Sequence, residues 1–128
     1  MIGAAIVELL AVPAVAALVG DRVYPVELPD EPVLPAVAYQ VISERPKRGG
    51  KRLPGVRSSS LQLSIVAADY DAAYAVAWAI RRRLEGWCGE VGGMVLYDAM
   101  EEDSRDVGDA APHVVAMTWR IHWKEKGE

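Results

Sequence analysis

Side chains that could carry catalysis or bind a metal ion are few in this chain of 128 residues. His113 and His122 are nine positions apart, an odd number, so in a regular strand they point to opposite faces and cannot share a metal ion. The serines at 58–60 offer hydroxyl groups, but the Gly-x-Ser-x-Gly turn that exposes a serine nucleophile is missing from the sequence. We therefore predict that the chain is not an enzyme and binds no cofactor and no metal ion.

The remaining reactive or ligand-binding motifs have structural interpretations. The one cysteine, Cys88, excludes an intrachain disulfide and favours synthesis in a reducing cytoplasm, and we interpret it as a small, partly buried apolar residue. The glycines at 49–50 and 89–93 match neither a P-loop nor a dinucleotide-binding fingerprint, so we expect turns there. The acidic run at 101–109 lacks the pattern of a calcium-binding loop.

Charge is separated along the chain into two opposite segments. Residues 44–57 hold six basic side chains and one acidic one, whereas residues 98–109 hold six acidic side chains and one basic one. We predict flexible charged loops at 44–57 and 98–112. The basic loop could contact nucleic-acid phosphate or an acidic protein surface; the net charge of −4 argues against specific nucleic-acid binding, and the complementary acidic segment favours a protein. The candidate residues for contact with a neighbouring copy or with another protein partner are Arg45, Lys47, Arg48, Lys51, Arg52, Glu101, Glu102, Asp103 and Asp106.

Composition predicts one domain spanning residues 1–128, because a chain of this length with 52% hydrophobic residues can bury one sizeable core. No stretch approaches the roughly 18 apolar residues of a membrane span, so we expect no membrane contact. The apolar run at 1–19 lacks a positively charged start and contains Glu8 and Pro13, which favours a helical hairpin or a kinked helix over a signal peptide.

Periodicity predicts a two-layer α+β fold. Helical spacing and strand alternation place the elements at 2–19 (helical), 37–42 and 60–67 (strands), 69 or 71 to 85 (helix), and 94–97 and 114–123 (strands). The order is α-β-β-α-β-β, which predicts a four-stranded, mostly antiparallel sheet with the helices on one face. The other face would carry small and polar side chains, suited either to solvent or to another subunit. Four prolines at 25–35 predict an extended arm on the surface.

Several segments together carry a family resemblance. They are the apolar opening helix, PAVAALVGDRVYP at 13–25, LPAVAYQVIS at 34–43, LQLSIVAADYDAAYAVAWAIRRRLEGW at 61–87 and the aromatic strand at 114–123. In this order they resemble the tail completion proteins, or tail terminators, of lambda-like long-tailed phages. The basic loop is more charged than that pattern requires.

The resemblance implies a structural virion protein without catalytic residues, made in the cytoplasm of a bacterial host. Six copies would form a ring on the head-proximal end of the tail tube, end tube elongation and join the head. The implied partners are other copies of the chain, the tail tube protein and a head-completion or connector protein. Two alternatives stay open: a head-tail connector or neck adaptor, and a small nucleic-acid-binding or regulatory α+β module acting through the basic loop.

Overall fold

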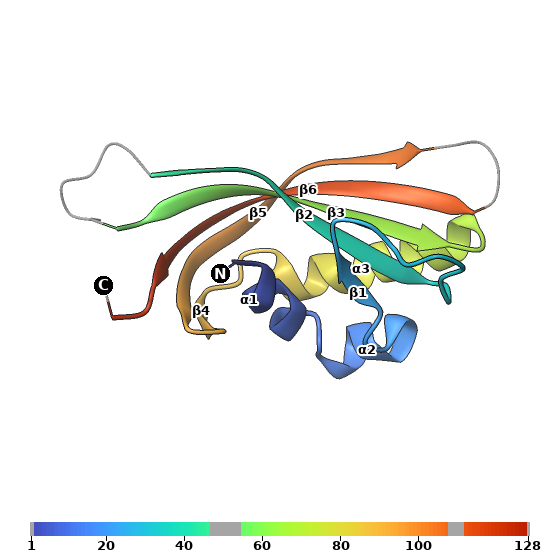
Figure 1. Ribbon diagram of the computed structural model, residues 1–128, viewed down its shortest axis with the longest axis horizontal. Helices are drawn as coiled ribbons and strands as arrows, with labels where there is room; N and C mark the ends of the chain where they lie inside the picture. Colours follow the sequence, from blue (N-terminus) through green and yellow to red (C-terminus); the bar gives the residue numbers. More distant parts are fainter. Residues whose placement is uncertain (1, 47–54, 108–111, 128) are drawn as a thin grey trace.

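Six strands form one curled sheet in the order β1-β2-β3-β6-β5-β4, and all three helices lie on one of its faces (Figure 1). The computed structural model describes residues 2–46, 55–107 and 112–127. The elements are α1 Ile2–Leu9, α2 Pro13–Val19, β1 Val23–Pro25, β2 Ala36–Pro46, β3 Arg57–Ala67, α3 Tyr70–Leu84, β4 Gly89–Val91, β5 Met94–Val107 and β6 His113–Glu125.

The predicted four-stranded sheet is wrong. Two strands of three residues each, β1 and β4, extend it to six, and β1 pairs in parallel with β2, so the sheet is mixed. Three residues are too few to show an alternating pattern. β1 also ends at Pro25, within the segment whose prolines predict an extended arm; an edge strand can accept proline because one side of its backbone has no ladder to complete.

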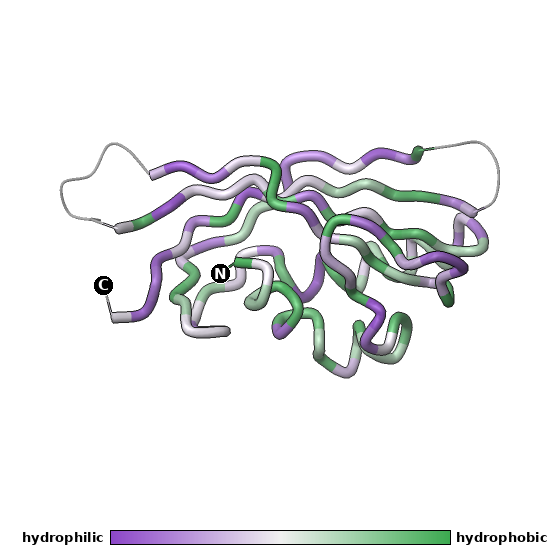
Figure 2. Tube along the Cα trace, viewed as in Figure 1, coloured by the Kyte–Doolittle hydropathy of each residue, from purple (hydrophilic) through white to green (hydrophobic). Residues whose placement is uncertain are grey.

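The predicted loop at 98–112 is also largely wrong, because β5 continues to Val107 instead of ending at 97. At the other end, residues 44–46 belong to β2 and Arg57 begins β3, so the predicted loop at 44–57 is shorter than expected. Charged side chains hid these strand extensions, since both faces of β5 are hydrophilic along its second half (Figure 2).

The helices begin and end where the sequence predicts. Pro13 opens α2, and α1 and α2 are bent by 91° relative to each other. Asp69 caps α3 by accepting a 2.8 Å hydrogen bond from the Ala72 backbone N–H. No helix among the described residues is by itself long and apolar enough to span a membrane, although α1 and α2 taken together pass a test of length and composition.

The core lies between the helices and the central strands. β3 and β6 pair without a bulge from Arg57↔Trp123 to Ala67↔His113, so every second residue of each strand faces the helices. Trp119, Leu63 and Ile80 of α3 are fully buried there. The opposite face carries partly exposed Gln62, Thr118, Arg120 and His122 and no described helix covers it.

The two long hairpins extend toward opposite ends of the molecule (Figure 1). β2 ends and β3 begins at the end of the sheet where β6 has Trp123, whereas β5 ends and β6 begins at the end where β3 has Ala67. Ten residue steps along β3 separate these ends, or about 33 Å at roughly 3.3 Å per residue. Arg45 near the end of β2 and Asp98 of β5 lie in the same row across the sheet, with β3 and β6 between them, and the acidic segment runs from there along β5 toward the other end.

Two buried tryptophans of β6 allow a matched stability test. Trp123 Nε1 donates a 2.8 Å hydrogen bond to Ser59 Oγ, whereas Trp119 Nε1 has no hydrogen-bond partner among the described residues. Trp123→Phe should therefore lower the free energy of unfolding by about 1 kcal/mol more than Trp119→Phe, because the two changes remove similar volume and only one breaks a hydrogen bond. Urea titrations followed by circular dichroism would measure both values, and equal losses would contradict the assignment.

Candidate functional site

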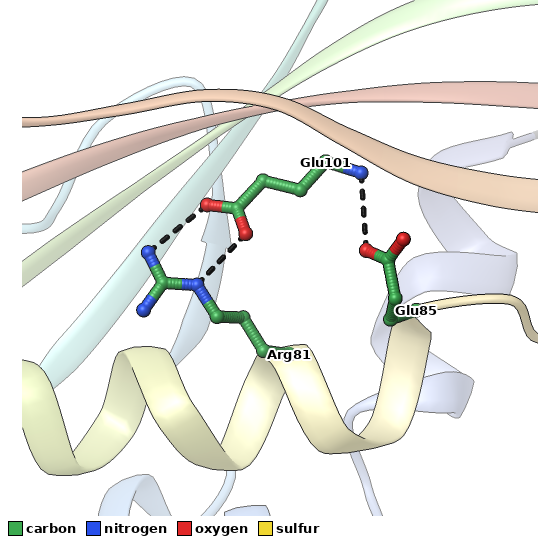
Figure 3. A network of polar contacts seen from close by, with 3 residues as sticks. All are labelled: Arg81, Glu85 and Glu101. Atoms are coloured by element: carbon green, nitrogen blue, oxygen red, sulfur yellow. Dashed lines mark hydrogen bonds and ion pairs between the residues drawn. The ribbon is translucent and has the colours of Figure 1, made fainter.

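The acidic half of β5 is anchored to α3 through Glu101. Its carboxylate accepts hydrogen bonds from Arg81 Nε at 2.8 Å and from the second Arg81 guanidinium nitrogen at 3.0 Å, and both side chains are only 20% exposed (Figure 3). The Glu85 carboxylate accepts a 3.2 Å hydrogen bond from the Glu101 backbone N–H. The hydrogen bond to Glu101 raises the pKa of the Arg81 guanidinium, so Arg81 stays charged over the whole physiological range.

The other predicted acidic contact residues also have partners within the chain. Glu102 lies 3.5 Å from Arg120, Asp103 lies 3.2 Å from Arg105, and Asp106 lies 3.4 Å from His113. These side chains are 42–52% exposed, so their ion pairs compete with water and leave the carboxylates available to a partner. The acidic segment is thus a structured, charged strand.

The predicted basic contact residues are described only in part. Arg45 lies in the exposed end of β2, whereas Lys47, Arg48, Lys51 and Arg52 lie outside the described residues. Because β3 and β6 lie between β2 and β5, the described geometry does not bring Arg45 together with the acidic residues of the same copy. A contact between different copies stays a prediction.

The residues considered for chemistry have structural roles. His113 faces the helix side, 5.2 Å from the Tyr70 ring, and His122 pairs with Asp98 at 2.8 Å on the opposite face, which confirms that the two histidines are separated by the sheet. Ser59 is fully buried and bonds to Trp123. Cys88 is exposed, so its predicted partial burial is wrong. Among the described residues no cluster of three side chains could hold a metal ion.

Sequence reasoning missed the two open strand edges. β1 covers the outer edge of β2 only as far as Tyr39, and β4 covers the outer edge of β5 only from Met94 to Leu96. Within the described chain no strand pairs with the outer edge of residues 40–46 or of residues 98–107. These edges became visible only with the sheet order, because neither extension was predicted as strand.

Two apolar surface features accompany these edges. Trp78 of α3 is 54% exposed. It lies beside the apolar stripe of that helix in the sequence, and this position indicates an exposed aromatic side chain. An apolar groove of about 540 Å³, lined mainly by Ile2, Ala4, Val26, Tyr39 and Val41, lies between α1 and the open part of β2. Sequence alone did not indicate this groove, since its lining comes from three separate segments.

Comparison with known proteins identifies the family. The chain matches the family described as "Tail completion protein gp17" over residues 4–124. A chain of the solved structure titled "Virion of native gene transfer agent (GTA) particle" shares its fold, with a TM-score of 0.70, 18% sequence identity and coverage of 96% of each chain. No curated protein matches the sequence. The family match spans nearly the whole chain and confirms the resemblance: this chain belongs to the tail completion protein gp17 family and is a structural protein of a virion tail.

Proposed function

We propose that copies of this protein close into a ring on the head-proximal end of the tail tube, end tube elongation and present the surface that joins the head. The ring acts by shape and without catalysis. The observation that supports this most strongly is the pair of open strand edges. One is formed by residues 40–46 of β2 and the other by residues 98–107 of β5, on opposite sides of the sheet.

The open edges are complementary in direction. β2 and β5 belong to opposite edges of one sheet, so residues 98–107 of one copy can meet residues 40–46 of the next copy and continue the sheet. β2 is antiparallel to β3, β3 to β6 and β6 to β5, so within one copy β2 and β5 run in opposite directions. When two copies are related by rotation alone and their strands are aligned, β5 of one copy therefore runs antiparallel to β2 of the next. Such a head-to-tail contact uses two different surfaces and therefore closes into a ring when the rotation between copies permits.

Curvature of the sheet favours closure over an open filament. The outer strands β2 and β5 each carry bulges, at Val41/Ser43 in β2 and at Leu96/Asp98 and Glu101/Asp103 in β5. Bulges increase local twist and bend a strand. The resulting curl, visible in Figure 1, gives each added copy a constant turn. A ring of six copies is the stoichiometry that we propose.

Deletion of the gene tests the function directly. Particles made without this protein should have tails of uncontrolled length, or tails of normal length that do not join heads, because the tube end would stay open to further addition. Negative-stain electron microscopy measures both properties. Normal tails on complete particles would show that the protein is not the tail cap.

Removing one outward-facing backbone donor tests the open edge. The Val37 N–H donates to the Arg22 carbonyl and the Tyr39 carbonyl accepts from the Val26 N–H, so Val41, next in this alternation, points its N–H away from β3. Val41→Pro should fold with nearly unchanged thermal stability, yet fail to cap gene-deleted tails in vitro. Val41→Ala keeps the N–H and should cap them. Capping by both variants would exclude pairing at this edge.

Neutralising the basic segment tests whether charge contributes to the contact between copies. Changing Lys47, Arg48, Lys51 and Arg52 together to Gln should slow capping and flatten its dependence on salt, because exposed charges act mainly on the rate of encounter. A control variant in which each of these lysines becomes Arg and each of these arginines becomes Lys keeps every charge and should behave like the wild type. Capping that responds neither to salt nor to neutralisation would contradict the predicted contact with the acidic segment.

A further inference from the structure

The exposed tryptophan of α3 is held in a fixed orientation. The Arg81 guanidinium lies 5.1 Å from the centre of the Trp78 ring, and Arg81 is itself held by the two hydrogen bonds that it donates to the Glu101 carboxylate of β5. An oriented aromatic side chain with a neighbouring arginine is the type of residue pair that most often anchors a protein interface. Trp78 lines a surface hollow together with Arg81 and with Glu101 of the open part of β5, and on its other side it borders Leu18 of α2.

The apolar groove offers a site for such an anchor. It lies beside the open part of β2, and both α1, which forms one wall, and α3 lie on the helix side of the sheet. Gly3 in this wall keeps the groove open and close to Tyr39, because a Cβ atom on Gly3 would lie 3.0 Å from the Tyr39 ring. The volume of about 540 Å³ falls within the range of sites that enclose a molecule larger than an indole ring.

We propose that Trp78 of one copy inserts into the groove between α1 and β2 of the next copy. This inference rests on the proposed ring. When the β5 edge of one copy meets the β2 edge of the next, their helix faces become continuous, so Trp78 and the groove lie on the same side of the new seam. Trp78 belongs to the β5 side of its own copy and the groove to the β2 side, which makes the contact one between copies.

Charge around the two features is complementary. Arg82 follows Trp78 by one helical turn, is exposed, and has no ion-pair partner among the described residues. The arm that leaves the groove after Val26 carries exposed Glu27, Asp30 and Glu31 and no basic residue before β2. Insertion of Trp78 thus brings a free cation to an acidic segment, and this favours a second copy of the chain as the occupant of the groove.

Substitution of the anchor tests the energetic part of the inference. Trp78→Ala should raise the protein concentration needed for half-maximal capping of gene-deleted tails by roughly tenfold or more, as for an interface hot spot, while its thermal stability stays close to wild type. Trp78→Phe should recover most of this loss. The control is Tyr97→Ala, which removes a similarly exposed aromatic ring from β5 instead of α3 and should have little effect. Equal capping by Trp78→Ala and wild type would overturn the inference.

Cross-linking tests the partner. Two preparations are made in a Cys88→Ser background, one with Arg82→Cys and the other with Glu27→Cys, and both keep Trp78. The two are mixed on gene-deleted tails and treated with a short bis-maleimide cross-linker. A heterodimer of the two variants is expected, and Tyr97→Cys in place of Arg82→Cys should not give it. Cross-links from Arg82→Cys to a different tail or head protein instead would overturn the inference. Rings on tails without these cross-links would refute the Trp78 contact alone, whereas tails on which the wild type forms no ring would refute the proposed function.

Discussion

The unbroken pairing of β3 with β6 is the constraint on which the rest of this structure depends. Eleven residue pairs in one register place Leu61, Leu63 and Ile65 beside Trp119, Met117 and Val115 on the helix side. A shift by one residue would turn every one of these side chains toward solvent, so the register and the buried core determine each other. Because the register of this pair is unbroken, β2 and β5 can carry the bulges without loss of the core.

The incomplete edges are a consequence of the same arrangement. β2 and β5 end at opposite ends of the sheet, and the three-residue strands β1 and β4 pair only with residues 37–39 of β2 and 94–96 of β5. Proteins usually protect open edges with charge, bulges or proline because such edges promote aggregation. Here the charged residues Glu101, Glu102 and Asp103 lie at a bulge in β5, and the opposite edge carries the bulge after Val41. The edges are therefore protected against indiscriminate pairing, while a partner with the matching curvature can still add to them.

The sequence predicted those elements in which apolar residues repeat regularly over many positions and in which a capping or terminating residue marks the ends. Asp69, the apolar stripe of α3 and Gly86 define that helix, and the alternation at 114–123 defines most of β6. The second half of β5 was missed because Glu101 and Asp106 occupy its helix-facing positions, where alternation is normally apolar. Their partners, Arg81 and His113, are distant in sequence, so only the folded chain shows that these carboxylates belong to a strand. The contact between the acidic residues and another copy stays a prediction, and the open edges and the groove were not predicted, since both depend on which strands are neighbours.

Charge and apolar surface have different tasks in this arrangement. Exposed ion pairs each contribute about 0–1 kcal/mol, and the acidic residues of β5 already have partners within the chain, so electrostatic attraction between copies is weak once they are in contact. In the proposed ring it acts at longer range and orients two copies through the opposite charges of segments 44–57 and 98–109. Backbone pairing along the open edges and burial of an aromatic ring act only at contact, where they can provide most of the affinity. Under the proposed function, a subunit built in this way stays separate at low concentration and assembles where a tube end holds several copies side by side.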